Sequence, residues 1–211
     1  MEIRWFESLG STQVYLVEEL KAGRAAAPVC VGASFQSDGS GSRGNRWIGE
    51  KGNLFISLAV ARAQLPSDLK IESASIYMAF LMQEVLAGMG SGVWLKWPND
   101  FYLDRHKIGG VITNIVGEDI VCGIGMNLVS APEGFGTIDI TVLPYNLTKM
   151  YCEMFENLPS WKQIFSKYQL EFEHSREFFT HYEEGRMALD EAVLLDDGSL
   201  MCKGQRIFSL R

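Results

Sequence analysis

Hydrophobic residues in the first two thirds of the chain form short runs separated by glycine-rich or polar segments, a pattern typical of strands joined by turns. Apolar positions at helical spacing follow Ser11 and Thr12, either of which can cap a helix. The pattern predicts strands at 3–6, 29–36, 54–60, 93–97, 101–103, 107–115 and 120–128. It predicts further helices at about 69–89 and at 147–182, the latter interrupted at 158–159. Short strands in the tail, 185–211, cannot build a core alone, so we expect the tail to dock on the rest.

Length and composition indicate an ordinary soluble globular protein. The chain has 211 residues, of which 47% are hydrophobic and 21% charged, which suits one main domain with a small appendage. Its net charge of -7 argues against general nucleic-acid binding, which needs a basic face. An anionic ligand must therefore be held by local positive charge.

The cysteines and the N-terminal sequence indicate a cytoplasmic protein. The four cysteines are scattered, and most lie in apolar runs, so we expect buried free thiols. No signal peptide opens the chain, and no apolar run approaches the roughly 20 residues that span a bilayer. The three histidines show no pairing typical of metal ligands.

A glycine-rich segment at 35–53 separates two predicted strands and holds five glycines, two arginines and one tryptophan. Glycines let backbone N–H groups approach a phosphate, arginines add positive charge, and Trp47 offers a flat face for a base. Gly39, Gly41 and Gly44 match G-x-G-x-x-G, but a strand rather than a helix follows, which argues against a dinucleotide fold. A flexible surface loop with incidental arginines remains the alternative.

Two lysines lie in predicted strands, where their charge needs an explanation. Lys96 lies in the apolar and aromatic run 93–97, where an unpaired ammonium is costly, so it needs an anion or must extend its head to water. Lys107 precedes Gly109 and Gly110, where backbone and ligand can come close. In strand 120–128, alternating glycines leave one face bare for something flat.

Together these segments resemble the biotin protein ligase family. The matching pieces, in order, are 11–13 (STQ), 39–47 (GSGSRGNRW), 96–100 (KWPND), 107–110 (KIGG) and 123–127 (GIGMN). They cover most of residues 8 to 128, and KWPND followed by K-x-x-G is the most specific. The resemblance implies an α+β fold: a mixed β-sheet flanked by helices, similar to class II synthetases, over 1–182, and a small, shortened SH3-like β domain over 183–211.

The resemblance also implies an activity and its partners. The enzyme would activate biotin with ATP and Mg²⁺ as biotinyl-5'-AMP, then transfer biotin to a lysine of a biotin carboxyl carrier protein such as that of acetyl-CoA carboxylase. We expect neither nucleic acid nor membrane as a partner, a monomer or weak homodimer, and no repressor role, because the chain starts directly at the catalytic part.

Site roles follow from the same resemblance. The catalytic residues would be Lys96, Arg43 and Asp100, and Asp100 would also position magnesium or the acceptor lysine. Trp47 would stack on adenine, while Asn127 and Lys107 would bind the nucleotide. The residues implied to bind biotin or ATP are Ser11, Thr12, Gln36, Gly39, Ser40, Gly41, Ser42, Trp47, Lys96, Asn99, Lys107, Gly109, Gly110, Gly123, Gly125 and Asn127.

The glycine-rich segment departs from the family pattern, which usually reads G-R-G-R-x-G-R-x-W. Ser40, Ser42 and Asn45 occupy the arginine positions, and Arg43 and Arg46 remain. One hypothesis is that Arg43 takes over the phosphate contact; another is that the segment holds its intermediate less tightly.

Two alternatives stay open. A lipoate or octanoate ligase or transferase shares the broad fold and the acyl chemistry, although KWPND favours biotin. A non-catalytic regulator that binds biotin or nucleotide would keep the pocket, but it gives Lys96 no evident purpose.

Overall fold

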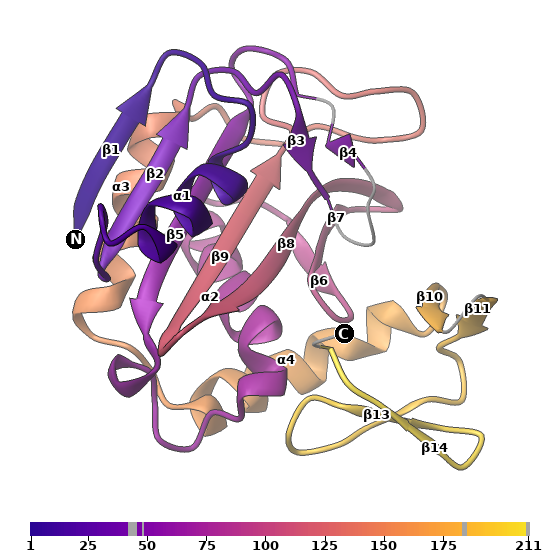
Figure 1. Ribbon diagram of the computed structural model, residues 1–211. Helices are drawn as coiled ribbons and strands as arrows, with labels where there is room; N and C mark the ends of the chain where they lie inside the picture. The colour runs from indigo at the N-terminus through magenta and orange to yellow at the C-terminus, as the bar shows by residue number, and fades with distance from the viewer. Residues whose placement is uncertain (42–45, 48, 183–184, 210–211) are drawn as a thin grey trace.

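A mixed seven-stranded sheet forms the centre of the molecule in the computed structural model, which describes residues 1–41, 46–47, 49–182 and 185–209 (Figure 1). The strand order is β1-β2-β5-β9-β8-β7-β6. Only β1 and β2 run parallel; the other neighbours are antiparallel. The strands are β1 Glu2–Phe6, β2 Val29–Ala33, β5 Leu54–Ala61, β6 Trp94–Lys96, β7 Asp100–Leu103, β8 His106–Val116 and β9 Asp119–Met126. All seven lie within or next to the predicted runs.

Helices cover both faces of this sheet (Figure 1). Helix α1, Thr12–Lys21, packs on one face, where Leu16 meets a small core that includes Val31 and Val121. The opposite face carries α2, Ala74–Gly88, α3, Pro144–Glu153, and α4, Trp161–Ser175. Because side chains alternate along a strand, Val31 joins the α1 core while its neighbour Cys30 joins the larger one.

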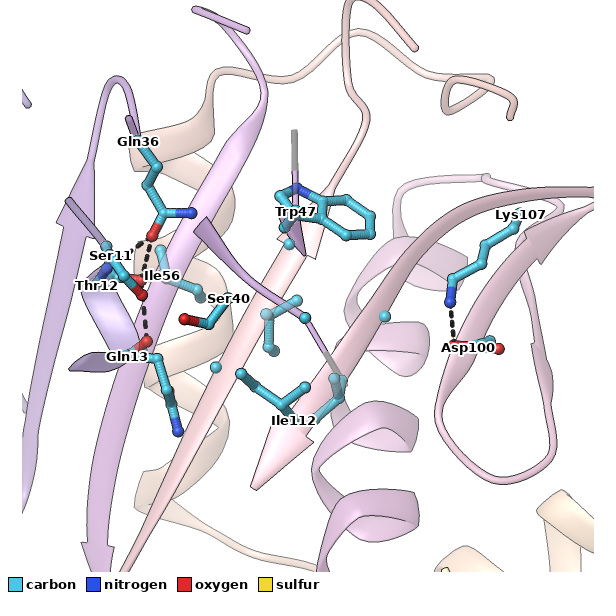
Figure 2. Close-up of a pocket in the computed structure, with 17 residues that line it drawn as sticks. Ser11, Thr12, Gln13, Gln36, Ser40, Trp47, Ile56, Asp100, Lys107 and Ile112 are labelled. Atoms are coloured by element: carbon cyan, nitrogen blue, oxygen red, sulfur yellow. Dashed lines mark hydrogen bonds and ion pairs between the residues drawn. The ribbon is translucent and has the colours of Figure 1, made fainter. Parts of the chain in front are cut away.

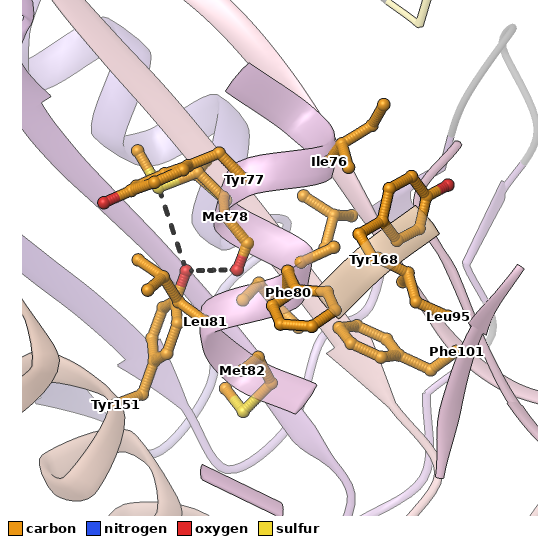
Figure 3. Close-up of a cluster of buried hydrophobic side chains, with 14 of the residues drawn as sticks. Ile76, Tyr77, Met78, Phe80, Leu81, Met82, Leu95, Phe101, Tyr151 and Tyr168 are labelled. Carbon is orange, nitrogen blue, oxygen red and sulfur yellow. Dashed lines mark hydrogen bonds between the residues drawn. The ribbon is translucent and has the colours of Figure 1, made fainter. Parts of the chain in front are cut away.

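The larger core is built around α2 (Figure 3). Most of this helix is buried, and the Tyr151 hydroxyl of α3 donates to the Met78 carbonyl at 3.0 Å. All four cysteines are buried free thiols, as expected. In the part of the chain that the structure describes, no helix is both long and apolar enough to cross a bilayer.

The helix predicted at 69–89 begins only at Ala74, after a 3-10 turn at Ile71–Ser73. Asp68, just before this turn, contacts a different helix. Its carboxylate accepts hydrogen bonds from the backbone N–H groups of Trp161 and Lys162, both at 3.0 Å. Asp68 thus satisfies free donors at the start of α4. Further 3-10 turns lie at Arg62–Gln64 and Met154–Glu156.

The prediction that α4 continues to 182 is wrong. The helix ends at Ser175, and β10, Phe179–Tyr182, pairs with β11, Gly185–Ala188. The aromatic and β-branched residues at 178–180 favour a strand, and Ser175 accepts a hydrogen bond from the Trp97 N–H at 3.1 Å. The two strands lie on either side of the expected domain boundary at 182, and that division stays a prediction.

The tail docks on the main body, as predicted. Its small sheet consists of β12 Val193–Leu194, β13 Leu200–Cys202 and β14 Gln205–Ile207. The indole N–H groups of Trp97 and Trp161 donate to the carbonyls of Gly198 and Asp196, both at 2.8 Å. Burial alone would raise the pKa of the Asp197 carboxyl, but hydrogen bonds from Ser199 and the cations Lys70 and Arg206 lower it to about 2. The predicted fold class, a mixed sheet followed by a small β region, is confirmed.

Glu171 makes the stability of the fold depend on pH. Its carboxylate lies between Gln83 Nε2, at 2.9 Å, and the Leu95 N–H, at 3.2 Å. Burial raises its pKa from 4.5 to about 7; the Leu95 hydrogen bond opposes this shift and Glu84 adds to it. Between these two values the folded chain holds a proton that the unfolded chain has lost, so stability falls as pH rises from about 4.5 to about 7 and then levels off.

We expect Glu171→Gln to remove this dependence. From pH 5 to pH 8 the free energy of unfolding of the wild type should fall, relative to the variant, by up to about 3 kcal/mol. Urea unfolding of both proteins at each pH measures the difference. A difference that does not change with pH would contradict the assignment.

Candidate active site

Two adjoining cavities lie beside α1 and the β3–β4 hairpin, which is formed by Gly39–Ser40 and Arg46–Trp47; Figure 2 shows the first of them. The first, here called the small pocket, reaches from the start of α1 across β9 to Asp100 and Lys107. The second, here called the outer trough, runs from Lys96 and Asp100 between α1 and the β10–β11 hairpin. The residues common to both are Gln13, Ser40, Gly41, Asp100, Lys107, Val111 and Ile112.

A buried hydrogen-bond network forms one end of the small pocket at the start of α1 (Figure 2). Ser11 caps the helix through a contact from the Val14 N–H at 3.4 Å. The backbone N–H and hydroxyl of Thr12 both donate to Gln36 Oε1, at 2.7 and 3.0 Å, and the Ser57 hydroxyl donates to Thr12 Oγ1 at 3.0 Å. The network places hydroxyl and amide groups in the wall of the small pocket.

The bare glycine face of β9 is covered by two side chains. A Cβ atom added to Gly125 would lie 2.7 Å from the Trp47 ring, and one added to Gly123 would lie 2.5 Å from Gln13 Oε1. Neither the Trp47 indole nitrogen nor Gln13 Oε1 has a hydrogen-bond partner among the described residues, although both atoms are buried. Within the small pocket the space open to the centre of a water molecule is about 50 Å³, and the pocket adjoins the outer trough at the residues that the two cavities share.

Three charged groups meet where the two cavities join. The Lys107 ammonium lies 2.5 Å from the Asp100 carboxylate, and the Lys96 ammonium lies 3.6 Å from it. Lys96 is buried, so burial lowers its pKa, which Asp100 opposes and Lys107 reinforces. The prediction that Lys96 needs a nearby anion is confirmed. Two cations share one carboxylate here, which leaves positive charge available to an anionic ligand.

The described residues do not form a magnesium site by themselves. Asp100 is already paired with two lysines, and no group of three His, Cys, Asp or Glu side chains suited to a metal occurs in the described part of the chain. Mg²⁺ commonly binds through one or two carboxylates together with substrate phosphates. The ion therefore fits this cleft only as part of a phosphate-bearing substrate.

Most of the predicted site residues border these cavities. Lys96 and Asn99 line the outer trough, and the others that line one or both cavities are Ser11, Thr12, Gln36, Ser40, Gly41, Trp47, Asp100, Lys107, Gly110, Gly123 and Gly125. Gly39, Gly109 and Asn127 do not line either cavity: a Cβ on Gly109 would lie 2.7 Å from the Gly125 carbonyl oxygen, and Asn127 Nδ2 donates to the Gly136 carbonyl at 3.1 Å. Ser42 and Arg43 lie outside the described residues.

Sequence reasoning gave no site role to several polar side chains that line the cavities, among them Gln13, Asn114 and Arg186. Gln13 directly follows the Ser11–Thr12 pair, which was a usable signal. Asn114 lies near the end of β8 and Arg186 lies in β11, in segments without a distinctive motif. Only the fold brings them to the cleft.

Known proteins share both the sequence and the fold. The profile of the Biotin/lipoate A/B protein ligase family matches residues 5–127. The Bifunctional ligase/repressor BirA of Escherichia coli is 35% identical over 130 residues, which are 57% of this chain and 38% of that protein. The Biotin--[acetyl-CoA-carboxylase] ligase of Paracoccus denitrificans is 31% identical over 106 residues, 46% of this chain and 43% of that one. The chain thus spans less than half the length of these relatives.

Solved structures agree over nearly the whole chain. The biotin acetyl coenzyme A carboxylase synthetase of Helicobacter pylori, solved with bound biotinylated ATP, has a TM-score of 0.93 and 41% identity, and the match covers 98% of this chain and 99% of that one. The Aquifex aeolicus biotin protein ligase, solved with biotin and ATP, has a TM-score of 0.76 and 20% identity, and the match covers 100% of this chain and 96% of that one. At this identity the similarity supports the fold alone. By its sequence profile and its fold, this chain belongs to the biotin/lipoate A/B protein ligase family.

Proposed function

We propose that the protein is an ATP-dependent biotin protein ligase that attaches biotin to a lysine of a biotin carboxyl carrier protein. The observation that carries this proposal is the meeting of Lys96, Lys107 and Asp100 where the small pocket joins the outer trough. A pocket suited to a neutral polar ring thus opens onto a cationic point beside a second, larger space. This arrangement fits an acid whose ring is buried in the small pocket and whose carboxylate meets a nucleotide at the junction of the cavities.

The first step joins two anions. A carboxylate oxygen of biotin attacks the α-phosphorus of ATP, the bond to the β-phosphate oxygen breaks, and pyrophosphate leaves, which gives biotinyl-5'-AMP. Lys107, which lines both cavities, would contact the carboxylate and the phosphate, while buried Lys96 would add a second positive charge. Fixed charges directed at the reacting groups are often the largest contribution to catalysis. Mg²⁺ would enter with ATP and neutralise its phosphates.

The second step forms an amide. The amine of an acceptor lysine attacks the acyl carbon of the mixed anhydride, AMP leaves, and the nitrogen loses a proton. The outer trough offers a path for this side chain to the junction of the cavities. The described residues offer no strong candidate for the base that deprotonates the acceptor lysine, so holding the reactants together would carry much of this step.

The remaining roles are also proposals. Ser11, Thr12 and Gln36 would bind the ring of biotin, and Trp47 would stack on adenine. Arg43 would contact phosphate in place of the missing arginines of the glycine-rich segment. We propose a cytoplasmic enzyme, monomeric or weakly dimeric, whose acceptor is the carrier domain of acetyl-CoA carboxylase.

Pyrophosphate release provides the test. The purified chain is incubated with Mg·ATP and biotin, lipoate or octanoate in turn, and a carrier domain is then added and analysed by mass spectrometry. We expect pyrophosphate and a biotin mass increment on the carrier with biotin alone. Lipoate as the preferred acid would favour the rival ligase, and biotin binding without pyrophosphate would indicate a non-catalytic binding protein.

A further inference from the structure

Gln13 is held in one orientation by two hydrogen bonds that use only its nitrogen. The residue is 5% exposed, and its Nε2 atom donates to Asn114 Oδ1 at 2.9 Å and to the Val121 carbonyl at 3.1 Å. A backbone carbonyl can only accept, so Val121 decides which end of the Gln13 amide is the nitrogen. The amide oxygen must therefore point the other way.

That oxygen is buried beside Gly123 in the wall of the small pocket and has no donor among the described residues. Gln13 lines the small pocket opposite the Trp47 side (Figure 2). A buried carbonyl oxygen without a donor is costly, and an orphan of this kind in a pocket marks the place of a missing N–H or O–H group.

We propose that Gln13 Oε1 accepts a hydrogen bond from a ureido N–H of biotin and thereby selects a cyclic urea over other acids. This inference rests on the proposed function and adds a residue to it. A cyclic urea carries two N–H donors, whereas the rings or chains of lipoate and octanoate carry none. A site that must hydrogen-bond a ligand N–H rejects an analogue without one, because the buried polar group then stays unpaired.

A purely structural role predicts different results. The two bonds from Nε2 already attach α1 to β8 and β9, and the oxygen contributes nothing to that attachment. Gln13→Met keeps the length of the side chain and removes the acceptor together with the Nε2 donor. Gln83→Met is the matched control, because Gln83 is a second buried glutamine, on α2 and outside both cavities, whose Nε2 donates to the Val93 carbonyl at 3.3 Å and to Glu171 at 2.9 Å.

Calorimetry of the full chain with three acids separates these roles. The acids are biotin, desthiobiotin, which keeps the urea, and a tetrahydrothiophene pentanoic acid without the urea. In Gln13→Met we expect the Kd to rise about tenfold or more for the first two and to stay unchanged for the third. Gln83→Met should bind all three acids as the wild type does. Equal losses for all three acids, no loss for biotin, or a Gln83→Met defect as large as that of Gln13→Met would overturn the proposal.

Binding of 2-imidazolidinone, the bare cyclic urea, separates this inference from the proposed activity. If the wild type binds 2-imidazolidinone and Gln13→Met does not, but biotin and ATP yield no pyrophosphate, the Gln13 assignment stands and the ligase proposal fails. If the wild type releases pyrophosphate and Gln13→Met binds biotin and 2-imidazolidinone like the wild type, the ligase proposal stands and the Gln13 assignment is wrong. If the wild type binds neither biotin nor 2-imidazolidinone, the Gln13 assignment is also wrong.

Discussion

Lys107→Ala is expected to slow pyrophosphate release from biotin and ATP by about 10²- to 10³-fold, the usual cost of removing one preorganised electrostatic contact. The Lys107 ammonium lies at the junction of the two cavities, 2.5 Å from Asp100. Its loss leaves Asp100 with Lys96 alone, at 3.6 Å, so the negative charge of Asp100 is less well neutralised where two anions must meet. The measurement is the single-turnover rate of pyrophosphate release at saturating biotin and ATP.

Two further lysine variants make the result specific. Lys167→Ala removes an exposed lysine that pairs with Glu84 on α2, away from both cavities, and should keep the rate within about twofold of the wild type. Lys107→Arg keeps the charge and should recover part of the rate. A rate for Lys107→Ala close to that of Lys167→Ala would show that the ammonium does not assist the first step.

Gly125→Ala is expected to raise the KM for ATP about tenfold or more, because stacking of one base on an aromatic ring contributes about 1–3 kcal/mol. The added methyl would lie 2.7 Å from Trp47 Cε2 and 2.8 Å from its Nε1, closer than a Cβ normally approaches. The indole must therefore leave its place on β9, and the flat space beside it is lost. Steady-state kinetics with varied ATP measure the effect, and calorimetry checks ATP binding directly.

Gly88→Ala is the matched control for this substitution. It adds the same methyl near the end of α2, where a Cβ meets no atom within 4 Å, and it should leave the KM for ATP unchanged. If Gly125→Ala binds ATP like the wild type and its thermal unfolding is also unaltered, Trp47 is not placed to stack on adenine.

Much of this fold was predictable because alternation and helical spacing directly report which side of an element is buried. The strands β5 and β9 and the start of α1 at Ser11 follow from such patterns. The ends of elements were harder. Asp68, which completes the start of α4, lies 93 residues from Trp161 in the sequence, and no local pattern announces that contact. The strand β10 likewise owes its form to pairing with β11.

Some residues of the site could likewise be predicted from the sequence, and others could not. Lys96, Asp100 and Lys107 stood out because charged residues in or beside buried strands need a reason. Arg186 did not, since an arginine in a short polar hairpin is ordinary, and only the return of the chain past α4 brings it to the outer trough. The glycines of β9 indicated a bare face for something flat, but the sequence did not reveal that Trp47 and Gln13 lie over it.

The central claim is that a neutral ring in the small pocket and a nucleotide beside it meet at the lysine pair. A crystal structure of the chain with a non-hydrolysable biotinyl-adenylate analogue tests this directly. We predict the ureido ring between Thr12 and Gln13, the linkage that replaces the phosphate within hydrogen-bond reach of Lys107, and the adenine against Trp47. An analogue bound with that linkage remote from both Lys96 and Lys107 would contradict the account.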